Sequence, residues 1–122
     1  MDKDQIADFM VSSIVDIDAQ SSVKEAAILL GGKKISSLLV KENEDYVGII
    51  TKTDIIQRVV ATGLDPKTTK INSVMSKPLL TRDHYITRRD ANEFMLRKKI
   101  KHLVITKFGK VAGILTLKDM VS

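Results

Sequence analysis

The sequence predicts a mixed α/β (α+β) fold in which two β-α-β-β-α repeats pack sheet to sheet about a pseudo-two-fold axis. Residues 6–57 align with residues 71–122 at a constant offset of 65, without a gap. Twelve of the 52 aligned pairs are identical, where chance gives about three, so the chain contains an internal repeat. Each copy holds short apolar runs and one amphipathic segment, and one copy alone is too small to cover its own sheet.

Composition limits the kinds of function that remain. The 122 residues include no Cys and no Trp, which excludes disulfides, thiolate catalysis and Cys-based zinc sites and leaves an aliphatic core. The N-terminus does not read as a signal peptide, and no apolar run approaches the roughly 20 residues of a membrane span. We therefore expect a cytoplasmic protein.

The net charge of +5 is unevenly distributed. Residues 1–61 carry 7 Lys/Arg and 10 Asp/Glu, whereas residues 62–122 carry 13 and 5. A basic half indicates either phosphates or an acidic partner, or simply a solvated surface with attraction between the two halves.

The repeat sets the expected domain boundaries. Repeat 1 covers residues 1–61 and repeat 2 covers residues 71–122, joined by a linker at residues 62–70 in which Gly63 and Pro66 break regular structure.

Each copy is expected to begin with an apolar turn, at residues 6–10 and 71–75, followed by a short strand. The first strands are predicted at residues 14–17 and 78–81. Two further strands follow in each copy, with hairpin turns between them. These strands are predicted at residues 36–40, 46–51, 101–105 and 110–116, with turns at 41–45 and 106–109.

Helix-capping patterns follow each first strand. Ser22 with Glu25 three residues later is a capping-box pattern, and Thr87 with Asp90 repeats it. The pair Gly31–Gly32 predicts that the first helix ends early and the second runs longer. A last helix is predicted to start at Thr51 and, in the second copy, at Thr116.

The phrase "GIITKTD" at residues 48–54 returns as "GILTLKD" at residues 113–119. Gly allows another group to approach the backbone closely, and Thr with Asp three residues later is a helix cap. The same atoms suit a nucleotide, because a helix N-terminus favours phosphate and a carboxylate can accept from both ribose hydroxyls. Both interpretations stay open at this point.

These features together resemble a tandem pair of cystathionine-β-synthase (CBS) domains, often called a Bateman module. The resemblance rests on "FMVSSIVDI" and "VMSKPLLT", on "ISSLLV" and "IKHLVI", and on the two G-h-h-T-x-x-D phrases, and it covers residues 6–122. It implies a regulatory module without enzymatic activity that binds AMP, ADP, ATP or S-adenosylmethionine in clefts between the repeats. It also implies a homodimer and no obligatory cofactor.

The resemblance implies two ligand sites. The first combines the strand starts of repeat 1 with the repeated phrase of repeat 2: Val15, Asp16, Ile35, Ser36, Lys101, Thr116, Lys118 and Asp119. The second is its mirror image: Thr51, Thr53, Asp54, Leu80, Thr81 and Ile100, with Lys101 again nearby. Each Asp would hold the ribose, and Ile35 would contact adenine. We favour the first site because Lys101 and Lys118 bring positive charge to it.

Other chemistry finds little support in the sequence. His84 and His102 have no spaced partners for a metal site, and no Ser or Thr has an obvious His and carboxylate to assist it in catalysis. The run "RKKIKH" at residues 97–102 either contacts nucleic acid or supplies cations to a helix C-terminus. The alternative function is therefore a scaffold with empty clefts, whose basic second half contacts nucleic acid or an acidic protein.

Overall fold

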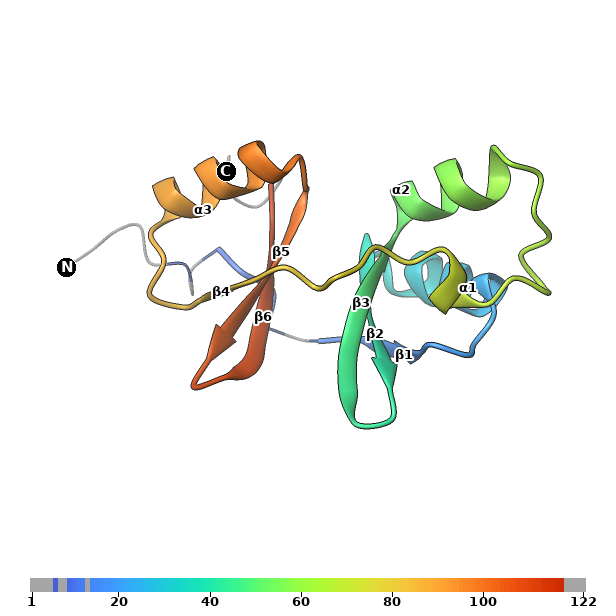
Figure 1. The fold of residues 1–122 in the computed structure, drawn as a ribbon, viewed down its shortest axis with the longest axis horizontal. Helices are drawn as coiled ribbons and strands as arrows, with labels where there is room; N and C mark the ends of the chain where they lie inside the picture. The colour runs from blue at the N-terminus through green and yellow to red at the C-terminus, as the bar shows by residue number, and fades with distance from the viewer. Residues whose placement is uncertain (1–5, 7–8, 13, 118–122) are drawn as a thin grey trace. The chain divides into compact units, whose positions relative to one another are not determined.

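The computed structural model describes residue 6, residues 9–12 and residues 14–117. The chain divides into two compact units, residues 15–79 and residues 1–14 with 80–122. We call them the first-repeat unit and the second-repeat unit. Each contains one three-stranded sheet with helices (Figure 1), which confirms the predicted mixed α+β class.

The first-repeat unit has a mixed sheet in the order β1-β2-β3. Strand β1 (Asp16–Asp18) is parallel to β2 (Ser37–Glu42), and β2 is antiparallel to β3 (Asp45–Thr51). The helices are α1 (Val23–Lys33), α2 (Lys52–Ile55) with a π-helical continuation (Ile56–Val60), and a 3-10 turn (Ile71–Ser73). The predicted order of elements is confirmed in this unit.

The second-repeat unit repeats this sheet in the order β4-β5-β6. Its elements are β4 (Thr81–Asp83), α3 (Arg88–Lys98), β5 (His102–Lys107) and β6 (Lys110–Thr116). Strand β4 is parallel to β5, and β5 is antiparallel to β6. Most of the last helix, predicted from Thr116, lies outside the described residues. The first strand of each repeat begins two to three residues later than predicted, because pairing with β2 and β5 starts at Asp16 and Thr81.

The predicted early end of the first helix is wrong. Helices α1 and α3 both span 11 residues, and both end at a left-handed residue, Lys34 with φ 55° and Lys99 with φ 57°. The glycines lie inside α1, where they are exposed and have open space around them. Gly lowers helix propensity by only about 1 kcal/mol per residue, and burial of Ala26 and Leu30 on the other face of α1 outweighs that cost.

The first apolar turn of each repeat packs on the sheet of the other repeat. Residues Ile71, Val74 and Met75 are buried in the core of the first-repeat unit. Ile6 belongs to the core of the second-repeat unit, with Phe9 and Met10 packed against it. Matching backbone bridges fix each segment, Ser76 to Ile49 and Val11 to Ile114. The compact units thus exchange a segment relative to the sequence repeats.

The predicted linker is part of the first-repeat unit. The carbonyl oxygens of Thr69 and Pro66 accept hydrogen bonds from the N–H groups of Val23 and Lys24, at 2.9 and 3.0 Å. These N–H groups belong to the first turn of α1 and have no partner within the helix. Residues 66–69 therefore complete the N-terminal end of α1.

Candidate functional site

The predicted site residues of the first-repeat unit gather at one end of its sheet. Parallel strands β1 and β2 start there, and antiparallel β3 ends there, with Thr51 opposite Ser37. The Val15 carbonyl accepts from Leu39 N–H at 3.1 Å, and the Ser36 carbonyl accepts from Lys52 N–H at 3.1 Å. The residues brought to this sheet end are Val15, Asp16, Ile35, Ser36, Thr51, Thr53 and Asp54.

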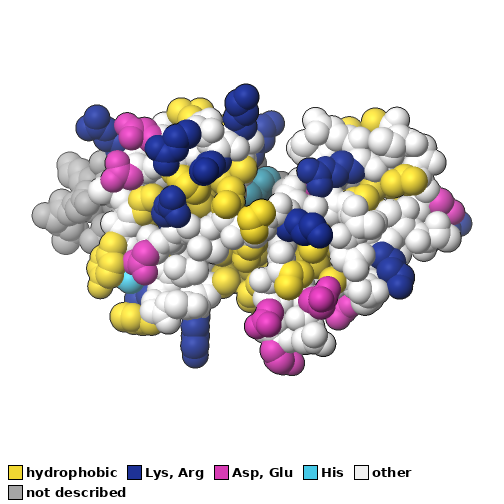
Figure 2. Space-filling model, in the orientation of Figure 1, with side chains coloured by type: hydrophobic (Ala, Val, Ile, Leu, Met, Phe, Trp, Pro, Cys, Tyr) yellow, Lys and Arg dark blue, Asp and Glu magenta, His cyan; other side chains and the backbone are white. Residues whose placement is uncertain are grey.

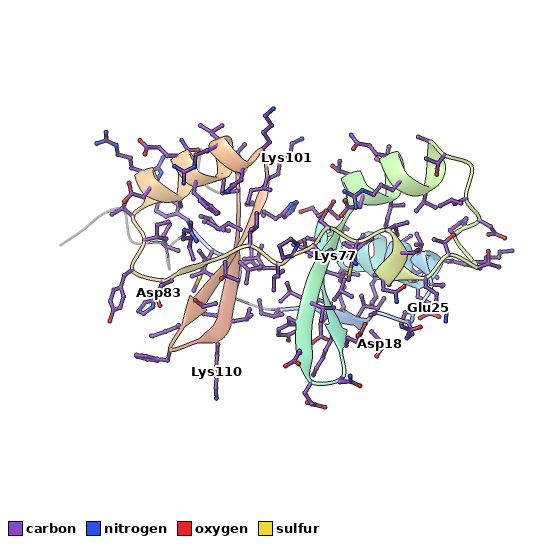
Figure 3. All side chains as sticks on the ribbon, viewed as in Figure 1. Asp18, Glu25, Lys77, Asp83, Lys101 and Lys110 are labelled. Atoms are coloured by element: carbon purple, nitrogen blue, oxygen red, sulfur yellow. The ribbon has the colours of Figure 1, made fainter. Side chains whose placement is uncertain are left out.

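The second-repeat unit has the same arrangement. The Leu80 carbonyl accepts from Val104 N–H at 3.3 Å, and the Lys101 carbonyl accepts from Leu117 N–H at 3.0 Å. His102 lies opposite Thr116. Leu80, Thr81, Ile100, Lys101 and Thr116 therefore share one sheet end, where Figure 3 labels the exposed Lys101. Lys118 and Asp119 lie outside the described residues.

Asp54 is held by hydrogen bonds on both of its carboxylate oxygens. Its Oδ2 accepts from the backbone N–H of Thr51 at 3.0 Å and from the Thr51 hydroxyl at 3.1 Å. Thr51 Oγ1 in turn accepts from Asp54 N–H at 3.1 Å, which completes a capping box. The predicted cap of the last helix is thereby confirmed in the first repeat.

The other oxygen of Asp54 is also engaged. Oδ1 accepts from the Ser76 hydroxyl at 2.9 Å and lies 3.7 Å from Nε of Arg58. Arg58 Nη1 donates to the carbonyl oxygens of Val74 and Met75, at 3.2 and 3.0 Å. We call Thr51, Asp54, Arg58 and Ser76 the Asp54 cluster. It joins the end of β3, the following helix and the exchanged segment.

The cluster restricts what Asp54 can bind. The side chain of Asp54 is only 8% exposed, and three hydrogen bonds and one ion pair occupy most of the roughly four acceptor positions of a carboxylate. A ribose hydroxyl would have to displace Ser76 or Thr51. The N–H groups of Lys52 and Asp54 are likewise engaged, by Ser36 and Thr51, so fewer donors at this helix start remain for an anion than the sequence predicted.

The second-repeat unit has a different residue at the position that corresponds to Ser76. Val11 occupies the position that corresponds to Ser76, since each makes the same bridge to β6 or β3. Valine has no hydroxyl, so position 11 cannot supply a counterpart of the Ser76 donor.

Asp16 is held toward its own sheet. Its Oδ2 accepts from the Tyr46 hydroxyl at 3.0 Å. Partial burial, followed by the hydrogen bond and the negative charge of Asp16, raises the pKa of Tyr46. A carboxylate at this sheet end is unfavourable for a phosphate.

Sequence reasoning missed two residues of the Asp54 cluster. Arg58 was detectable because it follows Asp54 by four residues, the spacing of an ion pair on a helix. Ser76 was not, because 22 residues separate it from Asp54. Among the residues that the structure describes, no cluster of three or more His, Cys, Asp or Glu side chains could hold a metal ion.

No helix within the described part of the chain has the length and apolarity to cross a membrane.

Comparison with solved structures supports the fold. A crystal structure of an uncharacterized conserved protein from Pyrococcus horikoshii has a TM-score of 0.90 and 31% identity, over 99% of this chain and 92% of that chain. The hexameric CBS-CP12 protein from bloom-forming cyanobacteria has a TM-score of 0.87 and 26% identity, over 93% of this chain and 64% of that chain.

Sequence relatives vary in length. An uncharacterized protein of Methanopyrus kandleri is 31% identical over 70% of this chain, which spans 44% of the relative. The CBS domain-containing protein YhcV of Bacillus subtilis is 27% identical over 94% of this chain, which spans 81% of it. Inosine-5'-monophosphate dehydrogenase of Korarchaeum cryptofilum is 29% identical over 92% of this chain, which spans only 22% of that enzyme.

The family model for the CBS domain matches residues 6–61 and again residues 71–122. The two matches coincide with the two copies of the internal repeat, and together they cover most of the sequence. The chain belongs to the CBS domain family and carries two copies of the domain.

Proposed function

We propose that this CBS pair is a regulatory module, without catalytic activity, that binds an adenosine-containing ligand and modulates a partner protein. The ligand classes are AMP, ADP, ATP and S-adenosylmethionine, as the resemblance implied. The observation that carries the proposal is the duplicated sheet end, where strand starts and a Thr-x-x-Asp corner meet in the first-repeat unit and the matching strand ends meet in the second. These elements supply backbone polar groups, an apolar side chain and a carboxylate, the set that adenosine requires.

We further propose that the ligand uses the first site, with Asp119 on the ribose and Lys101, Thr116 and Lys118 toward phosphate. Val15, Ile35 and Ser36 would contact adenine, and Asp16 would lie beside them. Two observations support this choice. The carboxylate of Asp54 already has internal partners on both oxygens, and Val11, which has no hydroxyl, occupies the position that matches Ser76.

Thermal unfolding in the presence of AMP, ATP and S-adenosylmethionine tests the proposal. A ligand present at 100 times its Kd adds roughly 2.7 kcal/mol of stability. Asp119→Ala is expected to remove most of that gain while the unliganded variant melts near the wild type.

Two results would contradict the proposed site. If none of the three compounds shifts the wild-type melting temperature, the alternative scaffold function is favoured. If Asp119→Ala keeps the full shift, the ligand binds elsewhere.

We also propose that the protein forms a homodimer. A similar structure supports this: a CBS-CP12 protein with a TM-score of 0.87 is described as hexameric, so this fold occurs in assemblies. Light scattering coupled to size exclusion gives the mass directly, and a mass near 13.6 kDa at micromolar concentration would contradict the dimer.

A further inference from the structure

An aromatic and basic cluster lies at the opposite end of the second-repeat sheet from the candidate ligand residues. It consists of His84, Tyr85, Lys107, Phe108 and Lys110, and we call it the hairpin-tip cluster. The N–H of His84 donates to the Thr106 carbonyl at 2.8 Å, which places the end of β4 beside the β5–β6 turn. Figure 3 labels Lys110 at this end of the β5–β6 hairpin and Lys101 at the other.

The two aromatic rings of the cluster are unusually accessible. Tyr85 and Phe108 are each 80% exposed. The His84 ring lies near both, with centroid distances of 4.1 Å to Tyr85 and 6.0 Å to Phe108, and it is tilted by 36° and 59° to them. Single exposed apolar residues are common, but here two exposed aromatic rings neighbour the same His84 ring. In Figure 2, hydrophobic and basic side chains, with an acidic one among them, lie on the surface of this part of the second-repeat unit.

The backbone of Phe108 is in a conformation that is energetically unfavourable for phenylalanine. Phe108 has φ 53°, a left-handed conformation that is rare and unfavourable for bulky residues. Asn43, at the matching position of the first repeat, has φ 57°, and Asn tolerates this conformation well. The β5–β6 turn thus has an exposed aromatic ring at the position where the β2–β3 turn has Asn43, a residue that adopts positive φ more easily.

The two hairpin turns also carry opposite charge. Residues 41–45 read "KENED" and residues 106–110 read "TKFGK", so the net charge is −2 in the first turn and +2 in the second. Lys107 and Lys110 are exposed, and Nζ of Lys107 lies 5.8 Å from the centroid of the Phe108 ring. Lysines beside exposed ring faces can contact phosphates while the rings stack on bases.

One acidic residue, Asp83, lies beside the hairpin-tip cluster. Asp83 Oδ1 accepts from Tyr85 N–H at 3.1 Å and lies 3.1 Å from Nδ1 of His84. The same turn occurs in the first repeat, where Asp18 Oδ1 accepts from Gln20 N–H at 2.8 Å. Asp83 therefore sets the turn that presents Tyr85.

We propose that the hairpin-tip cluster binds single-stranded nucleic acid, with Tyr85 and Phe108 stacking on bases and Lys107 and Lys110 contacting phosphates. Stacking on ring faces tolerates any base, so little sequence preference is expected. An acidic protein would engage the lysines but leave both ring faces unused. A membrane surface would favour a contiguous aliphatic tip, and this tip has only two separated rings.

The test uses fluorescence anisotropy with labelled oligothymidine of about 12 nucleotides, within the length that such platforms cover. The double variant Tyr85→Gln/Phe108→Asn introduces the residues that the first repeat has in the same turns, so it should fold. It is expected to weaken binding about tenfold or more. Lys107→Glu/Lys110→Asp should weaken binding and lower the slope of log K against log salt by about 1.4.

A matched control removes an exposed apolar side chain from another face. Leu96 in α3 is 61% exposed, and Leu96→Gln should leave oligothymidine binding unchanged. The proposal is overturned if wild-type protein does not bind oligothymidine at low salt, or if the Tyr85→Gln/Phe108→Asn variant binds as well as wild type. It is also overturned if polyglutamate or phosphatidylserine vesicles bind the cluster more tightly than oligothymidine does.

Discussion

Gly48 and Gly113 occupy the same position in the two repeated phrases, and each lies under an exchanged segment. A Cβ atom on Gly48 would lie 2.8 Å from the Ser76 carbonyl oxygen and 2.8 Å from Met75 Sδ. A Cβ on Gly113 would meet Val11 and Met10 at the same distances. The close approach that the sequence predicted at these glycines is confirmed, and the approaching groups are backbone and sulfur.

Gly48→Ala is therefore expected to destabilise the protein by about 1–3 kcal/mol, because the backbone carbonyl of Ser76 must shift to admit the methyl group. Urea unfolding followed by circular dichroism measures this change. Gly31→Ala is the matched control, since open space surrounds Gly31 in α1. It should stabilise the protein by about 0.5–1 kcal/mol; equal destabilisation by both variants would contradict the explanation.

Asp54 contributes to stability whether or not it contacts a ligand. Asp54→Ala removes the acceptor for Thr51 and leaves the partly buried hydroxyl of Ser76 and the half-exposed guanidinium of Arg58 without their carboxylate. We expect a loss of about 2 kcal/mol from the cap and the unsatisfied partners together. Ser76→Ala removes one hydrogen bond and should cost about 1 kcal/mol.

The same urea series separates the two contributions to the Asp54 cluster. In the double variant Asp54→Ala/Ser76→Ala, the loss should be smaller than the sum of the two single losses, because the residues share one hydrogen bond. Strictly additive losses would show that the Ser76–Asp54 bond contributes nothing to stability.

Helices and strands of this chain were largely predictable because local signals decide them. Ser22 and Thr87 accept hydrogen bonds from the backbone N–H of Glu25 and Asp90, as the capping patterns predicted. The error at Gly31–Gly32 has a physical cause. Propensity disfavours glycine in a helix, but the buried face of α1 and its left-handed end at Lys34 decide where the helix stops.

The β5–β6 turn contains Phe108 in a left-handed conformation, and we predict that a residue suited to this conformation would make the protein more stable. Phe108→Asn should raise the free energy of unfolding by about 0.5–1 kcal/mol, because asparagine accommodates the positive φ that strains phenylalanine. Urea unfolding of this variant is the measurement, and Asn43→Phe in the first repeat is the mirrored control, expected to lower stability. If Phe108→Asn instead destabilises the protein, the exposed ring contributes more to stability than its left-handed conformation costs.

The partition of the chain into units could not be predicted from the repeat alone. Sequence similarity aligns residues 6–10 with residues 71–75, but it does not say which sheet each segment packs on. The structure pairs Ser76 with Ile49 and Val11 with Ile114, so each segment completes the other repeat's unit. Pairing between distant segments depends on tertiary packing, which local patterns do not encode.

The candidate ligand site was predictable only in part for the same reason. Residues near one another in the sequence, such as Thr51 and Asp54, were correctly expected to interact, and the strand starts do lie at the same sheet end. The asymmetry between the sites depends on Ser76 and Val11. Their significance appears only when the structure shows that Ser76 reaches Asp54.

This asymmetry predicts how many ligands one chain binds. Wild-type protein should bind one adenosine-containing ligand, because the carboxylate of Asp54 is engaged by Ser76 and Arg58. Ser76→Val introduces the residue that the other repeat has at this position, keeps the backbone bridge to Ile49, and releases Oδ1 of Asp54. The variant should therefore bind a second ligand. Isothermal titration calorimetry, with whichever of AMP, ATP and S-adenosylmethionine stabilises the wild type, gives the stoichiometry.

In the calorimetric experiment, Asp119→Ala in the Ser76→Val background should return the stoichiometry from two to one, which would assign the remaining ligand to Asp54. The reciprocal variant Val11→Ser supplies a hydroxyl to the first site and should weaken wild-type binding. Two ligands on the wild-type chain would show that Ser76 does not keep Asp54 from the ribose. A stoichiometry of one in Ser76→Val would mean that Thr51 and Arg58 alone hold the carboxylate, because they are the partners that this substitution leaves in place.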